Sequence, residues 1–81
     1  MDLSKNEIEL LQSLLRYLQS FKVVDAMWIA TPERRIAYSL KQKGFVNINK
    51  CSFNYNLDEI ELQKNLGDDQ KKILTLLALG I

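Results

Sequence analysis

The chain has 81 residues, of which 47% are hydrophobic, and 11 basic against 10 acidic residues give a net charge of +1. This length suits one domain over residues 1–81 with a small core. The absence of His and a single Cys exclude a His/Cys metal site and an internal disulfide, and they favour an intracellular, cytoplasmic protein. No apolar run approaches the roughly 18–20 residues of a membrane span, and the N-terminus lacks signal-peptide character.

The sequence lacks the residue patterns that are typical of enzyme active sites. It contains no His base, no glycine-rich phosphate loop and no nucleophile with a partner close in sequence. We therefore expect no enzyme activity, cofactor or metal. The charges are unevenly distributed, because residues 31–50 hold five basic residues against one acidic residue, a balance of +4, and residues 51–70 reverse it to −4. This pattern predicts one basic face and one acidic end.

The first predicted element is an amphipathic helix. Ser4 followed by Glu7 is a capping box, so the helix should begin at about Lys5. It should end near Gln19 or Ser20. The apolar residues that recur at helical spacing and define its buried side are Ile8, Leu11, Leu14, Leu15 and Leu18.

The segment "SFKVVDAMWIA" predicts a second, short helix of about two turns, because its apolar residues share one helical face. Trp28 lies on that apolar side. An aromatic ring there could serve as a stacking platform for a base, but the position favours burial in the core.

A third helix is predicted over residues 32–43. Thr31 as N-cap, Pro32 at the first helical position and Glu33 in the first turn form a start signal, and Gly44 is the expected C-cap residue. Helical spacing buries one side, consisting of Ile36, Ala37 and Leu40. The opposite side has cations, an aromatic hydroxyl and an amide but no carboxylate, and it consists of Thr31, Arg34, Arg35, Tyr38, Lys41 and Gln42.

The stretch "VNINKCSFNYNL" alternates apolar and polar residues and predicts a hairpin with strand 45–49, a turn near 50–51 and strand 52–57. Its apolar row must lie on the helices, because an isolated two-stranded ribbon is marginal in water. The asparagines should then point outward, and they are Asn47, Asn49, Asn54 and Asn56. This row is either a set of amide contacts to nucleic acid or a solvated strand face.

Two further helices are predicted after the hairpin. The first spans about residues 58–66 and ends at Gly67; the second is "QKKILTLLAL", capped by Asp68 and Asp69 and ended by Gly80. The second helix is apolar around most of its circumference. We expect Ile73, Leu76 and Leu77 to close the core. Leu74 and Leu79 are then left for a second partner, which is either a second copy in a homodimer or a larger polypeptide.

The order helix, short helix, capped basic helix, Gly and hairpin resembles a winged helix-turn-helix, and "RIAYSLKQKGFVNI" is similar to its junction between recognition helix and wing. The resemblance covers residues 4–57 and leaves 58–81 as a C-terminal helical extension. It implies an α+β fold with three helices, a two-stranded wing and two C-terminal helices. The sequence departs from the pattern at "MWIATP", where the usual small-residue turn with Gly is missing.

A narrower resemblance covers "YNLDEIELQKNLGDDQKKIL", which is similar to the segment after the wing in the N-terminal winged-helix domain of archaeal and eukaryotic phenylalanyl-tRNA synthetase alpha subunits. The residues that fit are Tyr55, Leu57, Gly67, Lys71, Lys72, Ile73 and Leu74. The sequence has "DEIE" where the family has Thr-Glu-Glu-Gly. This resemblance implies a tRNA-binding or interdomain appendage of a longer chain.

The leading interpretation is a small DNA-binding winged-helix protein that acts as a transcriptional regulator. Arg34 and Arg35 are placed to contact base edges, since Arg suits guanine O6 and N7. Tyr38, Lys41 and Lys43 would hold phosphates. The wing would add backbone or minor-groove contacts through Asn47, Asn49, Lys50 and Asn54. The alternatives are a tRNA-binding appendage, a protein-interaction module, and a basic face that serves only solubility.

Overall fold

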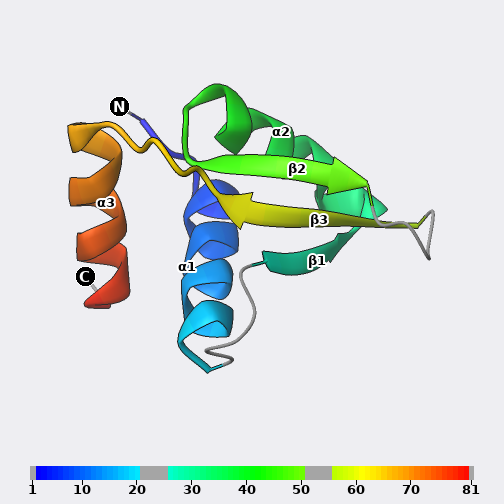
Figure 1. The fold of residues 1–81 in the computed structure, drawn as a ribbon, viewed down its shortest axis with the longest axis horizontal. Coiled ribbons are helices and arrows are strands. Elements are labelled where there is room, and N and C mark those ends of the chain that lie inside the picture. Colours follow the sequence, from blue (N-terminus) through cyan, green and yellow to red (C-terminus); the bar gives the residue numbers. More distant parts are fainter. Residues whose placement is uncertain (1, 21–25, 51–55, 81) are drawn as a thin grey trace.

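The computed structural model describes residues 2–20, 26–50 and 56–80, and these form a small α+β domain (Figure 1). In chain order the elements are α1 (Lys5–Ser20), β1 (Ala26–Ala30), the 3-10 turn η1 (Thr31–Glu33), α2 (Arg34–Gln42), β2 (Val46–Lys50), β3 (Leu57–Leu62) and α3 (Asp68–Ala78).

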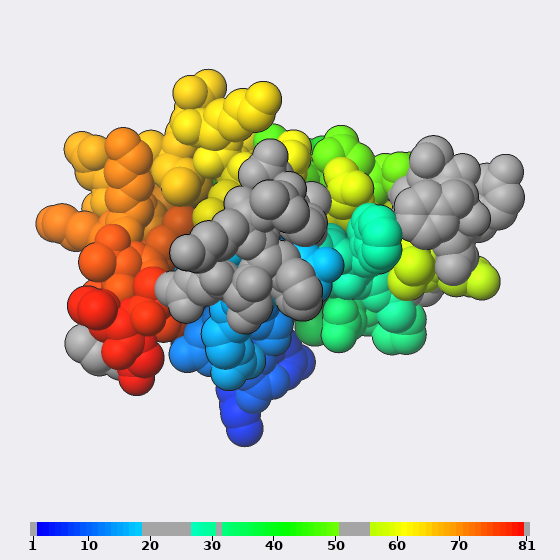
Figure 2. Space-filling view, turned by 60° about the horizontal axis from the view of Figure 1, so that its bottom comes forward, coloured from blue at the N-terminus to red at the C-terminus, as the bar shows by residue number. Residues whose placement is uncertain are grey.

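The three strands form one antiparallel sheet in the order β1-β3-β2. Met27 and Ile48 both pair with Ile60 on the central strand, so these three side chains lie on the same face of the sheet. In Figure 1 this sheet lies in front of α1 and α2, and α3 stands at one end beside α1. Figure 2 shows the same end, with α3 in orange and red next to α1 in blue. The helices α1 and α2 therefore cover one face of the sheet, and α3 packs against α1.

The core lies between the inner face of the sheet and the helices. It consists of Leu10, Leu11, Leu14, Ile29, Ala37, Leu40, Phe45, Val46, Ile60 and Leu74. Phe45 is its largest fully buried side chain. The Phe45 N–H donates to the Leu40 carbonyl (3.0 Å), and the Phe45 carbonyl accepts from the Gln63 N–H (3.0 Å). Gly44, at φ 84°, makes the left-handed turn that ends α2. This turn places Phe45 between the helix and the hairpin.

The capping box at the start of α1 is confirmed. The Ser4 N–H donates to Glu7 Oε1 (2.8 Å), and the Glu7 N–H donates to Ser4 Oγ (3.2 Å). The helix begins at Lys5 and ends at Ser20, as predicted. Short-range capping signals of this kind act within one turn, which is why the sequence alone located this helix.

The Glu7 carboxylate also joins α1 to the end of α2. It is buried, with 4% of its surface exposed. It accepts hydrogen bonds from Ser39 Oγ (2.8 Å) and Lys43 Nζ (2.7 Å). Burial by itself would raise the pKa of Glu7, but the bonds from Lys43, Ser4 and Ser39 outweigh it and lower the pKa from 4.5 to about 2. The charged form is therefore part of the folded structure.

The second predicted helix is wrong for residues 26–30, which form β1; the rest of that prediction, at 21–25, lies outside the described residues. Met27 and Ile29 face the core, whereas Trp28 between them is 50% exposed. The prediction that Trp28 is in the core is therefore also wrong. Short apolar runs fit helix and strand periods equally well, and pairing with β3 selects the strand.

The helix predicted over residues 58–66 is also wrong, because residues 57–62 form the central strand. Asp58 and Ile60 are buried on its inner face. In the predicted hairpin, the strand at 45–49 agrees with β2 to within one residue, but its partner begins at Leu57 instead of at 52. Residues 51–55 lie outside the described part of the chain. Two flanking strands satisfy the backbone of β3, and this long-range pairing overrides the local helix pattern.

The last helix is confirmed in position, since α3 follows Gly67 and has Asp68 and Asp69 in its first turn. Its predicted orientation is confirmed for Ile73 and Leu77, which pack against the core, and wrong for Leu74 and Leu76. Leu74 is buried, with 7% exposed, while Leu76 is 49% exposed. Residues two positions apart lie on opposite sides of a helix, and α3 packs against α1 through the side that holds Leu74. Leu74 is therefore not available to a second copy, whereas Leu79 is 69% exposed.

The helix-turn-helix is the main part of the predicted architecture that is missing. Between β1 and β2 the described chain has a single α-helix, α2, which η1 joins without an intervening turn. The count of three helices before the wing is therefore wrong. Within the described ranges, no helix has both the length and the apolar character needed to cross a membrane.

The Glu7 contacts predict a specific acid sensitivity. A folded-state pKa of about 2 against 4.5 means that Glu7 stabilises the fold above about pH 4.5 and loses this effect as the pH falls towards 2. Glu7→Gln should lower the free energy of unfolding at neutral pH by about 2 kcal/mol. It should also flatten the loss of stability at acid pH. Urea unfolding followed by circular dichroism at neutral and acid pH measures both effects.

The matched control is Glu9→Gln, since Glu9 is exposed on the same helix. This variant should unfold like the parent at both pH values. An acid dependence of Glu7→Gln identical to that of the parent protein would contradict the assignment.

Candidate nucleic-acid interface

One side of α2 exposes a row of polar side chains. Ala37 and Leu40 are fully buried on the inner side, and helical spacing places the exposed residues on the other side. These are Arg35, Tyr38, Lys41 and Gln42. Tyr38 is 49% exposed, and Lys41 Nζ lies 6.0 Å from the centre of its ring. This spacing is at the outer limit of a cation–π contact.

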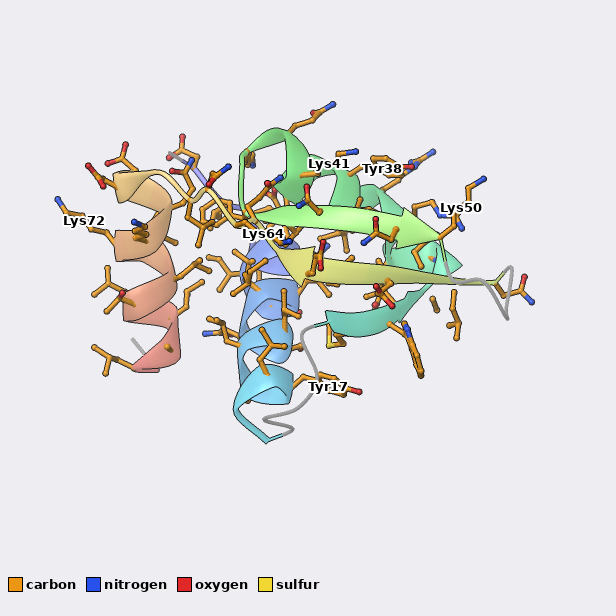
Figure 3. The ribbon with its side chains drawn as sticks, viewed as in Figure 1. Tyr17, Tyr38, Lys41, Lys50, Lys64 and Lys72 are labelled. Atoms are coloured by element: carbon orange, nitrogen blue, oxygen red, sulfur yellow. The ribbon has the colours of Figure 1, made fainter. Side chains whose placement is uncertain are left out.

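Lys50, at the end of β2, extends this row towards the hairpin. It pairs across the strands with Asp58, and Asp58 in turn contacts Arg34 at the start of α2. Lys50 therefore lies near the N-terminal end of α2. Figure 3 shows Tyr38, Lys41 and Lys50 along one side of the molecule, with Lys64 and Lys72 elsewhere. We call Arg35, Tyr38, Lys41, Gln42 and Lys50 the basic strip.

Arg34, which was predicted to belong to the same surface, is engaged in the fold. Its Nε donates to Asp58 Oδ2. The Asp58 side chain is 5% exposed and that of Arg34 is 39% exposed. The bond to Asp58 raises the pKa of Arg34 above its ordinary value, so the guanidinium stays charged. The prediction that Arg34 points freely outward is therefore wrong, although part of its side chain remains accessible.

Lys43, predicted to hold a phosphate, also has a structural partner. Its Nζ bonds Glu7 Oε1 (2.7 Å) and the Asp2 carbonyl (2.9 Å), which turns it towards the N-terminus of α1. Lys43 therefore has a structural role in joining α2 to α1, and its predicted contact with phosphate stays a prediction. The side chain of Thr31, the remaining helix residue of the predicted site, lies outside the described residues.

Two asparagines of the predicted row are in β2, on the outer face of the sheet and away from the basic strip. Asn47 and Asn49 point outward as predicted, and their cross-strand partners are Glu61 and Glu59. Asn54 lies outside the described residues. Carboxylates directly beside the two asparagines repel phosphates. The structure therefore separates the predicted wing asparagines from the basic strip.

Trp28 completes this outer face on the opposite side of β3. It pairs with Glu59 across the strands, and its Nε1 donates to Glu59 Oε2 (3.4 Å). Sequence reasoning missed this cluster of Trp28, Glu59 and Glu61. The signal that could have found it is the alternation within "AMWIA" and "LDEIEL", which fits strands as well as helices.

The described parts of the chain contain no group of three or more metal-ligating residues. No protein-family model, curated protein or solved structure gave a significant match to the sequence.

The position of Trp28 gives a direct optical test, because it is the only tryptophan of the chain. With half of its surface exposed, acrylamide should quench its fluorescence in the folded protein nearly as strongly as in the urea-unfolded protein. A buried ring would instead be protected and would emit at shorter wavelength. Strong protection in the folded state would contradict the outward orientation.

Proposed function

We propose that this chain binds double-stranded DNA through the basic strip. The observation that carries the proposal is the composition of the outer side of α2, whose exposed residues include two cations, an aromatic hydroxyl and an amide but no carboxylate. Arg35 suits bidentate contact with guanine, and Gln42 suits adenine. Lys41, Lys50 and Tyr38 supply phosphate contacts.

The fold in this proposal is a reduced winged helix, with α2 as the recognition helix and β2–β3 as the wing. In its support, α2 ends at Gly44 and leads directly into the hairpin. Within the described residues, the short turn η1 directly precedes α2, in the position where a helix-turn-helix would have its first helix. A nine-residue helix such as α2 is about 13 Å long, enough to contact bases across a major groove about 12 Å wide.

The carboxylates on the outer face of the sheet limit the direction from which DNA can approach. Glu59 and Glu61 lie on the outer face of the sheet, and the helices cover its inner face. DNA should therefore approach along the outer side of α2 and be repelled from the outer face of the sheet. Contacts from Arg35 and Gln42 to base edges would make binding sequence-selective, which is the property that a transcriptional regulator needs.

If the basic strip binds DNA, replacing two of its cations together should lower the affinity for DNA. Arg35→Ala with Lys41→Ala should weaken binding to a short DNA duplex by about 2–4 kcal/mol. The slope of log K against log salt should shrink by about 1 to 2, because up to two ionic contacts are lost. Fluorescence anisotropy across a salt series measures both quantities.

The matched control is Arg16→Ala with Lys64→Ala, which removes one arginine and one lysine from exposed positions outside the strip. This variant should bind nearly as the parent protein does. Equal losses in the two double variants would mean that only net charge matters, and the site would be rejected. Tighter binding of the parent to tRNA than to duplex DNA at the same salt would favour an RNA partner instead.

A second candidate function is self-association through α3. Of the four exposed large hydrophobic residues in the described chain, Leu76 and Leu79 lie one turn apart on this helix. Lys72 lies one turn before Leu76, and the last turn has no basic residue. In an antiparallel pair of α3 helices, each Lys72 would face the negative end of the partner's helix dipole. We propose a two-fold dimer through Leu76 and Leu79.

Leu76→Glu should convert such a dimer to a monomer without unfolding it, because the replaced side chain is half exposed. Sedimentation equilibrium at micromolar concentration gives the mass. Asn6→Glu, the same charge change at an exposed position on α1, should leave the mass unchanged. A parent protein that stays monomeric would contradict the dimer without affecting the proposed DNA contact.

A further inference from the structure

Asp58 is a charged residue in a place that normally holds an apolar one. It lies on the inner face of the central strand, with 3% of its surface exposed. Its neighbours across the sheet are Ile29 on β1 and Lys50 on β2. A buried carboxylate is costly unless it is paired. Its ion-pair partner among the described residues is Arg34, so the pair needs an explanation beyond packing.

The contact engages only part of the guanidinium. Arg34 has five N–H donors, and it bonds Asp58 through Nε. Within the described residues, neither Nη atom has a hydrogen-bond partner, and 39% of the side chain is exposed. The two Nη atoms thus keep four donors for another acceptor, while the bond at Nε restricts how the planar group can turn.

The guanidinium also lies where the helix and the hairpin meet. Arg34 is the first residue of α2 and is adjacent to Arg35 of the basic strip. Lys50, at the end of β2, pairs with Asp58 across the strands. An anion bound at the Nη atoms would therefore lie beside Arg35 and Lys50, at the end of the strip nearest the hairpin.

We propose that Asp58 is a positioning residue, which holds Arg34 through Nε so that its Nη atoms bind a DNA phosphate at the junction of α2 and the hairpin. The inference rests on the proposed DNA binding and adds a contact to it. An arginine whose guanidinium is already held in place loses less side-chain entropy on binding than a free arginine does. A planar guanidinium can also make two parallel bonds to one phosphate, which a lysine cannot.

The rival explanation is that Asp58 only neutralises Arg34 and anchors α2. The two explanations predict opposite signs for Asp58→Asn. This change removes a negative charge beside the strip, so simple electrostatics predicts tighter DNA binding with a steeper salt dependence. Positioning predicts weaker binding despite the added net positive charge, because the guanidinium is no longer held.

The test is a cycle of Arg34→Gln, Asp58→Asn and the double variant, with a short mixed-sequence DNA duplex as the probe and circular dichroism to confirm folding. We expect each single variant to bind about fivefold more weakly than the parent. The double variant should bind no more weakly than Arg34→Gln, since Asp58 acts only through Arg34. Binding by folded Asp58→Asn that equals or exceeds that of the parent would overturn the proposal.

Arg34→Lys keeps the charge and can still pair with Asp58, but it cannot make two parallel bonds to one phosphate. It therefore tests the role of the guanidinium even if Asp58→Asn fails to fold. It should bind DNA about as weakly as Arg34→Gln, and binding at the level of the parent would also overturn the proposal. The result is separable from the failure of the proposed function. If Arg35→Ala with Lys41→Ala behaves like its Arg16 and Lys64 control, the strip itself is rejected. If the strip is confirmed and these variants bind normally, only the role of Asp58 is rejected.

Discussion

The buried carboxylate of Glu7 is the interaction on which the arrangement of the helices depends. It closes the capping box of α1 with Ser4 and accepts bonds from Ser39 and Lys43 at the far end of α2. One side chain therefore starts one helix and fixes the end of another. A carboxylate can be buried in this way because its hydrogen bonds keep it charged, with a pKa of about 2. The alternative, an unpaired buried charge, would destabilise so small a core.

A second buried carboxylate holds the other end of α2. Asp58 contacts Arg34 at the first residue of the helix, and Glu7 contacts Lys43 just after its last residue. Each end of the helix thus carries one cation paired with one carboxylate. Two of the cations predicted to contact nucleic acid are thus used to attach α2 to β3 and α1. This attachment fixes which side of the helix faces outward, and it leaves Arg35 and Lys41 exposed on that side.

The sheet separates the charges that lie close together in the sequence. Glu59 and Glu61 alternate with Asp58 and Ile60 along β3, so the first two point outward and the other two inward. The outer face therefore carries carboxylates beside Asn47 and Asn49, whereas the cations lie on the side of α2. A nearly neutral chain thereby presents one basic and one acidic surface. This division is the physical basis for proposing a single direction of approach for DNA.

The sequence by itself determined the features that depend on contacts within one or two turns. The capping box located α1, Gly44 marked the end of α2, and Asp68 with Asp69 located the start of α3. The spacing within α2 also identified the exposed Arg35 and Lys41. Only the tertiary structure decided that residues 26–30 and 57–62 are strands, because their periodicity is ambiguous and the pairing partners are distant in the chain. It likewise assigned Arg34 to Asp58 and Lys43 to Glu7, across separations of 24 and 36 residues that no local pattern encodes.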